Sequence, residues 1–414
     1  MAVDRLSAIA SQLTSASGPV DTIARQTPED VVITLAIRTP MCKAKRGGLK
    51  DTTLDALVFK ILEQVRQKSK IDPQLVHDIC LGNVRDGKAA YHARAASLAA
   101  GFPNTTCVST AARFCSSGLT ATQHIANEII TGTIDVGIAV GAESLSEGNE
   151  RLSRPFVEEI MNTSEEARDC MLPMGATSEN VASDFNITRH QQDEYAVESY
   201  RRAEHAQKQG WFDDEIVPIT VRKDGKDVTI DHDEIRWGTT LEGISKLKPS
   251  FPEYGDTTHA GNASQITDGA AALILMKRSK AIELGQPILA KYVGTTIAGL
   301  APRIMGIGPT LAIPKLLARY NLTLSSVDVL EINEAFASMA VYCRDYFKLS
   351  PDWSKMNPRG GAIALGHPFG CTGVRQIVSG LSECRRRGSK VLVTSMCLGT
   401  GMGMAGLFVN EQNI

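Results

Sequence analysis

One strand-and-helix pattern occurs twice in the chain, and this repeat limits the fold more than any other feature. The segment Ile71–Asn83 (IDPQLVHDICLGN) contains an Asp, a short gap and an apolar run that ends in Asn, and Leu324–Asn333 (LSSVDVLEIN) has the same order. Cys115-Ser-Ser-Gly, a helix-like stretch and VGIAVGAES are echoed by Cys371-Thr-Gly, a helix-like stretch and VLVTSMCLG. Self-similarity over this length predicts a duplicated unit.

Each copy alternates apolar strand-like runs with segments of helical spacing. In 53–68, for example, Leu54, Leu57, Val58, Ile61, Leu62 and Val65 fall on one helical face. This alternation predicts an α/β fold of two pseudo-symmetric α/β/α halves with a mostly parallel sheet. Ligands in such sheets bind beyond the carboxyl ends of the strands.

The repeat also divides the chain. We expect a leader at 1–28, an N-terminal α/β half made of 29–150 and 251–283, and a C-terminal half at 284–414. Residues 151–250 are more polar, carry charge clusters such as SEEARD and WFDDE, and lack the strand–helix alternation. We interpret them as an inserted, largely helical and loop-rich subdomain.

Composition excludes several classes of protein. A net charge of −2 over 414 residues gives no basic field for nucleic acid, and runs such as AALILM are too short for a membrane span. The nine cysteines have no regular spacing, no CxxC and no HxxxH, so neither a disulfide framework nor a zinc site is predicted.

Two residues near the C-terminus suggest chemistry. His367 lies in the Gly/Pro-rich turn GHPFG, and Cys397 ends an apolar strand and is followed by Gly399, Gly401 and Gly403. A lone His or Cys is more often structural. The pair gains weight from Cys115, because it lies at the equivalent strand–helix junction of the first copy.

The residues after the leader resemble the thiolase family. Five motifs match in order: CSSG at 115–118, MGATSENVA at 174–182, GNASQITDGA at 261–270, NEAF at 333–336, and GGAIALGHPFGCTG with CLGTGMG at 360–403. Within the family, the chain is most similar to the peroxisomal 3-ketoacyl-CoA thiolases of β-oxidation. The resemblance implies cleavage of a 3-ketoacyl-CoA by CoA, giving acetyl-CoA and a shortened acyl-CoA.

The resemblance also implies the role of each matching residue. Cys115 is the nucleophile, activated by His367, and the positive end of the helix at 118–130 is expected to lower its pKa. Cys397 is the acid/base that protonates the enolate and later deprotonates CoA. The enolate oxygen is met by His367 and a water on Asn333, and the other oxyanion by the N–H groups of Cys115 and Gly399.

Coenzyme A is expected as a substrate, with no metal or prosthetic group. DEIRWGTTLE resembles the segment whose Arg contacts the nucleotide end of CoA, which makes Arg236 the candidate, and Ser264 resembles the serine near the pantetheine. A solvated surface charge is the other interpretation of Arg236. The family expectation for assembly is a homodimer.

The segment Arg5-Leu6, five residues, Gln12-Leu13 resembles the N-terminal type-2 peroxisomal signal. It implies a peroxisomal location and the matching import receptor as a partner. A disordered terminal tail is the alternative.

The chain departs from the family next to the nucleophile. Ala112 replaces the usual Asn, and Phe114 stands where Gln is common. Two alternatives therefore stay open: a biosynthetic acetoacetyl-CoA thiolase with the same residues, and a catalytically weak CoA-binding scaffold. A GxGxxG match at 401–406 is rejected as an NAD site, because LFVN is expected to continue as a strand where a helix would have to open.

Overall fold

A computed structural model describes residues 18–147, 156–349 and 354–412. The signal-like segment at 5–13 lies outside these ranges. No helix within them is long and apolar enough to cross a membrane.

The N-terminal half forms one side of a large sheet, in the strand order β1-β8-β5-β3-β4. Its strands are β1 (Val31–Arg38), β3 (Asp78–Gly82), β4 (Cys107–Ala111), β5 (Val136–Glu143) and β8 (Thr267–Lys277), with the short β2 (Cys42–Lys43) beside β8. Its helices are α2 (Pro19–Ala24), α3 (Leu54–Ser69), α4 (Ala89–Ala99), α5 (Ser117–Ile130) and α11 (Arg278–Glu283), with a 3₁₀ turn at Pro73–Leu75.

The C-terminal half repeats this arrangement in the order β9-β12-β11-β10. Its strands are β9 (Ala290–Gly299), β10 (Val329–Ile332), β11 (Val391–Leu398) and β12 (Met402–Asn410). Its helices are α12 (Gly308–Arg319), α13 (Ala337–Tyr346), α14 (Ala362–Leu365) and α15 (Phe369–Arg387), with 3₁₀ turns at Pro302–Ile307 and Leu324–Ser326. In both halves a 3₁₀ turn leads into a strand that ends before an Asn, so the predicted duplication is confirmed.

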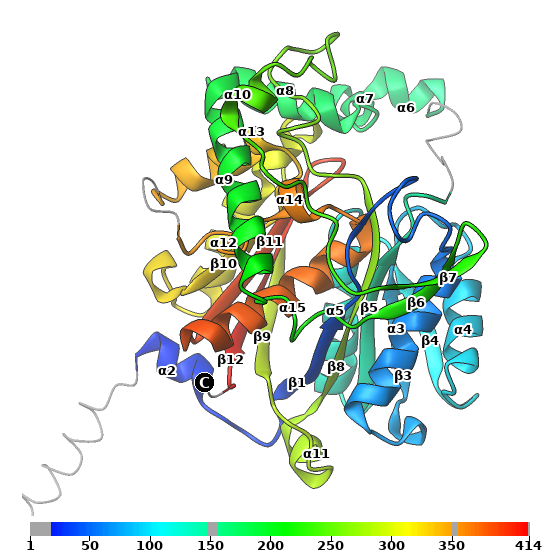
Figure 1. Ribbon diagram of the computed structural model, residues 1–414. Coiled ribbons are helices and arrows are strands. Elements are labelled where there is room, and N and C mark those ends of the chain that lie inside the picture. The colour runs from blue at the N-terminus through cyan, green and yellow to red at the C-terminus, as the bar shows by residue number, and fades with distance from the viewer. Residues whose placement is uncertain (1–17, 148–155, 350–353, 413–414) are drawn as a thin grey trace, which may run out of the picture.

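The two halves share one sheet and one helical layer. The sheet is continuous because β1 and β9 pair, at Val32 with Lys291 and Ile33 with Ala290. Helices α5 and α15 pack against each other between the two halves, α3 and α4 cover the outer face of one, and α12 and α13 cover the outer face of the other (Figure 1). The two halves of this one sheet lie on either side of the α5–α15 layer, which gives five layers in the order helix, half-sheet, helix, half-sheet, helix.

The expectation of a mostly parallel sheet is wrong. Among the strands of the described residues, only the β3–β4, β3–β5 and β10–β11 pairs are parallel, whereas β8 and β12 run antiparallel to both of their main neighbours. The cause is local for β11 and β12, because a turn of three residues joins them and a short hairpin can connect only antiparallel strands.

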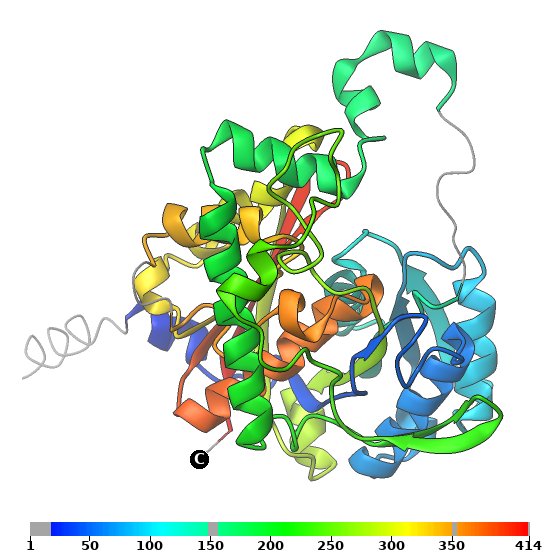
Figure 2. The same cartoon turned by 45° about the horizontal axis from the view of Figure 1, so that its top comes forward.

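The segment between β5 and β8 contains more strand than the sequence predicted. Its helices are α6 (Glu158–Thr163), α7 (Glu165–Asp169), α8 (Met174–Asp184), α9 (Arg189–Lys208) and α10 (Leu241–Ser245). The unexpected part is the hairpin of β6 (Ile219–Lys223) and β7 (Lys226–Ile230), which turns at Asp224-Gly225. Figure 2 shows α6 and α7 projecting from the body of the molecule.

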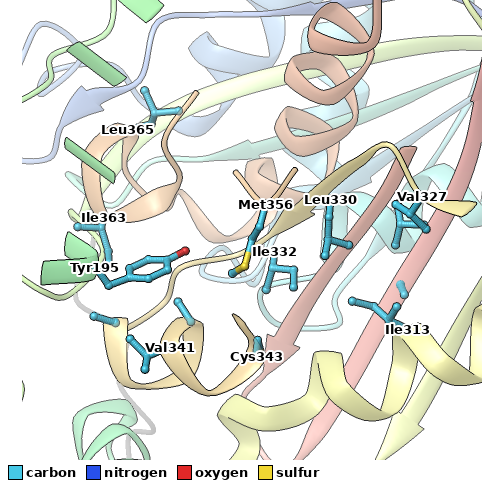
Figure 3. Packing of buried hydrophobic residues seen from close by; sticks show 14 of the residues in the cluster. Tyr195, Ile313, Val327, Leu330, Ile332, Val341, Cys343, Met356, Ile363 and Leu365 are labelled. Atoms are coloured by element: carbon cyan, nitrogen blue, oxygen red, sulfur yellow. The ribbon is translucent and has the colours of Figure 1, made fainter. Parts of the chain in front are cut away.

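Part of this segment belongs to the core of the C-terminal half. Tyr195 of α9 packs with Ile332 of β10, Val341 of α13 and Met356, as Figure 3 shows. Helix α9 is therefore fixed beside the strand that carries Asn333 at its end.

Candidate active site

A glycine contact brings the starts of α5 and α15 together. A Cβ at Gly118 would lie 2.6 Å from the Gly370 carbonyl oxygen, and one at Gly141 of β5 would lie 2.5 Å from the same atom. A Cβ at Gly373 would lie 2.3 Å from the Leu119 nitrogen. Only glycine permits backbones this close. The turns before the two helices, which carry Cys115 and His367, are therefore neighbours.

Cys115 lies in the turn between β4 and α5, where Phe114 has a φ of 44°. Its sulfur accepts from the backbone N–H groups of Cys115 and Gly399, yet burial raises the pKa of the thiol to about 12. The expectation that the start of α5 lowers this pKa is wrong. The loss of hydration of a thiolate outweighs the favourable amides, and Glu143 adds a further unfavourable charge.

His367 is buried and held at both ring nitrogens. Nδ1 lies 2.6 Å from Thr372 Oγ1, and that hydroxyl donates to the Pro368 carbonyl at 3.1 Å, so Nδ1–H is the donor to Thr372. Nε2 accepts from Asn333 Nδ2 at 3.3 Å, which agrees with this tautomer. Burial, assisted by Arg375, lowers the pKa of His367 to about 3. The ring is neutral, with its basic lone pair on Nε2.

Asn333 follows β10 directly and is 2% exposed. Its N–H donates to the Ser395 carbonyl, whereas Oδ1 has no hydrogen-bond partner among the described residues. A buried acceptor without a partner is costly unless a solvent or ligand group satisfies it. The orientation of Asn333 thus suits a water or substrate donor.

Cys397 is near the end of β11 and is 1% exposed. Burial raises the pKa of its thiol well above the ordinary value, and the nearby thiols of Cys115 and Cys343 add to the effect. Its sulfur lies 3.9 Å from the Met339 sulfur. The thiol is therefore a neutral acid in an apolar setting, within electrostatic range of Cys115.

The glycines after Cys397 have different roles. Gly401 has a φ of 84°, and a Cβ there would lie 2.2 Å from the Leu300 carbonyl oxygen, while one at Gly403 would lie 2.3 Å from the Gly308 oxygen. These two are required by packing within the chain. At Gly399 a Cβ would make only ordinary contacts, 3.6 Å from Met174 and Phe114. Gly399 is thus the one of the three at which a side chain would meet no close backbone contact.

A cavity of about 520 Å³ contains Cys115 and His367 in its wall. The rest of its lining is largely apolar and includes Met174, Phe251 and Phe336. A volume of this size suits a small-molecule substrate, and an apolar lining favours a hydrocarbon chain.

The two predicted ligand-binding residues differ in position. Ser264 lines the cavity, and its N–H donates to the Ala335 carbonyl at 3.0 Å. Arg236 does not line it. The charge of Arg236 acts on the hydroxyl of Tyr200, which accepts from the cavity residue Gln265 at 3.1 Å. Arg236 thus lies near the cavity but is not part of its lining.

Three residues that support the site were missed in the sequence. Thr372 fixes the tautomer of His367. The carboxylate of Glu334, fully buried, accepts from Tyr195, Ser199 and Asn357, which anchors the segment after Asn333. The third is Glu143 of β5. Thr372 and Glu334 lie inside motifs that the sequence had singled out, and that proximity was the available signal.

Glu143 connects the two halves beside the turns that carry Cys115 and His367. It accepts from Asn83 Nδ2 at 3.0 Å, from the N–H groups of Val84 and Arg85, and from the Gly370 N–H at 2.9 Å. Burial nevertheless raises its pKa to about 7. The backbone just after His367 is therefore bound to a carboxylate of the N-terminal half.

Comparison with known protein families shows which family has this fold and these residues. The thiolase N-terminal domain model matches residues 31–279, and the thiolase C-terminal domain model matches residues 286–410. The chain belongs to the thiolase family.

Individual thiolases are similar along most of the chain. The peroxisomal 3-ketoacyl-CoA thiolase of Yarrowia lipolytica is 50% identical, covering 99% of this chain and 100% of that protein. The crystal structure of the dimeric peroxisomal thiolase of Saccharomyces cerevisiae is 42% identical, with a TM-score of 0.88 over 94% of this chain and 100% of that one. Human mitochondrial 3-ketoacyl-CoA thiolase in complex with CoA is 35% identical, with a TM-score of 0.82 over 93% and 98%. These likenesses confirm the predicted thiolase fold.

In this thiolase, Thr372→Val should change the tautomer of His367. A buried Nδ1–H without an acceptor costs about 1–3 kcal/mol, so the proton should move toward Nε2. Nitrogen NMR of histidine-labelled protein measures the tautomer directly. Thr394→Val is the control, because the Thr394 hydroxyl is also buried and has no partner among the described residues. An unchanged Nδ1–H signal in Thr372→Val would contradict the assignment.

Proposed function

We propose that this thiolase cleaves 3-ketoacyl-CoA with CoA, giving acetyl-CoA and an acyl-CoA shortened by two carbons. It is an acyltransferase acting at the last step of fatty-acid β-oxidation. The observation that carries the proposal lies at the junction of the two halves, where Cys115 and His367 line one largely apolar cavity. Asn333 contacts His367 there, and Cys397 is within electrostatic range of Cys115. Similarity to peroxisomal 3-ketoacyl-CoA thiolases supports the same reaction.

In the first half-reaction the Cys115 sulfur attacks the 3-keto carbon while its proton passes to Nε2 of His367. Because burial raises the pKa of the thiol and lowers that of the imidazole, proton transfer must accompany bond formation. The C2–C3 bond then breaks, and its electron pair goes to the enolate of acetyl-CoA. Cys397 protonates C2 and becomes a thiolate.

The second half-reaction restores every proton. The Cys397 thiolate takes the proton of the incoming CoA thiol, and the CoA sulfur attacks the acyl thioester on Cys115. Collapse of the adduct expels the Cys115 thiolate, which regains its proton from His367. A thiol acid/base suits both steps, because it gives its proton to carbon in the first half-reaction and takes one from another thiol, that of CoA, in the second.

Two groups of donors stabilise the oxyanions. The N–H groups of Cys115 and Gly399 already converge on the Cys115 sulfur, so a carbonyl carbon bonded to that sulfur places its oxygen near them. The enolate oxygen is met by His367 and by a water on Asn333. CoA is the second substrate, and the reaction proposed requires no metal or prosthetic group.

Replacing Cys115 with Ala should lower kcat by at least roughly 1,000-fold, because no other group can carry the acyl chain. The measurement is the loss of 3-ketoacyl-CoA absorbance on adding CoA, with C4, C8 and C16 substrates. Cys107→Ala is the control, since Cys107 is an exposed cysteine on the preceding strand.

The same assay separates the alternatives. Turnover of C4 but not of C8 or C16 would favour a biosynthetic acetoacetyl-CoA thiolase. CoA binding without turnover of any substrate would identify a scaffold altered by Ala112 and Phe114. Activity retained in Cys115→Ala would overturn the assignment of the nucleophile.

We propose that CoA extends from the cavity past Ser264 toward Arg236, whose charge meets the nucleotide phosphates. Arg236→Gln should raise KM for CoA about 10-fold with kcat little changed, as expected on losing one charged hydrogen bond outside the reacting centre. Arg222→Gln, an exposed change on β6, should leave KM unaltered. An unchanged KM in Arg236→Gln would remove this residue from the site.

We also propose that the protein assembles as a homodimer and is located in the peroxisome. The proposed division of the chain is a leader at 1–28, an N-terminal half at 29–150 and 251–283, an inserted subdomain at 151–250 and a C-terminal half at 284–414. Similarity to the dimeric yeast enzyme supports the homodimer, and the peroxisomal relatives support the location. We assign import to Arg5-Leu6 and Gln12-Leu13 acting on the type-2 signal receptor.

Deleting residues 1–15 should leave the protein in the cytosol, because the receptor reads the Arg-Leu and Gln-Leu pairs. Fluorescence microscopy of the full chain and of the deletion, each fused at its C-terminus to a fluorescent protein, measures the location. Peroxisomal import of the deletion would place the signal elsewhere in the chain.

A further inference from the structure

A second cavity, of about 690 Å³, shares no lining residue with the catalytic one. Its walls come from α9, α13 and the last turn of α15, which Figure 1 labels. Five arginines line it: Arg201, Arg202, Arg344, Arg386 and Arg387. This concentration is notable in a chain with a net charge of −2, since like charges held together oppose folding unless something compensates them.

The carboxylates nearby do not compensate all of this charge. Glu198 is shared by Arg201, at 2.6 Å and 2.7 Å, and Arg202, at 2.7 Å. Glu383 behind the wall is shared by Arg386, Arg387 and a third arginine, Arg359. Although burial acts in the opposite direction, these arginines hold the pKa of both carboxyls below the ordinary value. Glu194 also lines the cavity, and Arg344 pairs with Asp345 at 2.8 Å. Among the described residues the five lining arginines therefore face four carboxylates, those of Glu194, Glu198, Asp345 and Glu383, which leaves a small positive excess.

Hydrogen bonds to carboxylates orient the guanidinium groups and leave some of their N–H donors unused within the described part of the chain. Among the described residues, hydrogen bonds engage Nε and Nη2 of Arg201 and Arg386, but only Nε of Arg344 and Arg387. The terminal nitrogens that remain come from three different helices. Planar forks held in place by carboxylates lose little side-chain freedom on binding an anion.

We propose that this cavity binds a multiply charged phosphate anion of the pyrophosphate class. Convergent arginines match phosphate oxygens through paired hydrogen bonds, and two linked phosphates can reach more than one helix. The Trp211 ring in the wall is already engaged, because the Arg386 guanidinium lies 3.8 Å from its centre and the His205 ring meets it edge-on at 5.0 Å. The site is separate from the one proposed for CoA.

Titration calorimetry of the full chain with inorganic pyrophosphate, in about 50 mM salt to limit screening, tests the site. Arg201→Gln with Arg344→Gln removes one guanidinium from each of two walls and should weaken binding at least about 10-fold. Arg222→Gln with Lys226→Gln makes the same charge change on the β6–β7 hairpin and should leave binding unaltered. Arg201→Glu, at a side chain that is 65% exposed, provides a second variant if the double variant does not fold.

Added CoA distinguishes this site from the catalytic one. Pyrophosphate binding that persists at saturating CoA and in Arg236→Gln, yet is lost in the cavity variants, supports the proposal. Binding that is lost with CoA or in Arg236→Gln but kept in the cavity variants would place the anion at the CoA phosphates and overturn it. Absence of binding to the wild-type chain would overturn it as well.

Discussion

The close approach of α5 and α15 is the constraint on which the rest of the structure depends. Gly118, Gly141, Gly370 and Gly373 leave no room for a single extra carbon, so two backbones meet at van der Waals distance in the middle helical layer. Each helix is preceded by the turn that carries Cys115 or His367. Because the contact is backbone against backbone, it fixes these turns more firmly than adaptable side chains could.

Burial sets the electrical state of the site. It raises the pKa of the Cys115 and Cys397 thiols and lowers that of His367, so the resting groups are all neutral. A neutral site avoids the cost of holding an ion pair away from water. The dipoles already present, the amides at Cys115 and Gly399 and the side chain of Asn333, then serve charge that develops only during reaction.

The sequence allowed much of this structure to be predicted, and the failures have physical causes. The repeat at Ile71–Asn83 and Leu324–Asn333 predicted the duplication, since both copies form the same turn and strand. Strand direction was mispredicted because it depends on connection length, which periodicity does not report. The β6–β7 hairpin was missed as well, because the periodicity of its short strands did not show that they pair across the Asp224-Gly225 turn.

Predictions about the site were likewise correct in part and wrong in part. The sequence motifs allowed Cys115 and His367 to be assigned to one site. The structure agrees, because both residues line the same cavity. The effect of the α5 terminus on Cys115 was mispredicted because burial depends on the whole fold. Thr372 and Glu143 escaped notice because their importance lies in which buried atoms they contact.

The pairing of β1 with β9 has a consequence for how such a site can arise. Two identical half-length chains meeting at this seam would present the same side chain on both sides of their axis. Because the two chains are identical, any substitution that favoured a nucleophile at one junction would also occur at the equivalent position of the other chain. Covalent fusion removes that symmetry, so the two junctions can carry different residues, Cys115 in one half and His367 in the other. A chain that contains both copies can therefore carry unequal chemistry at its two helix junctions, which a pair of identical half-length chains cannot.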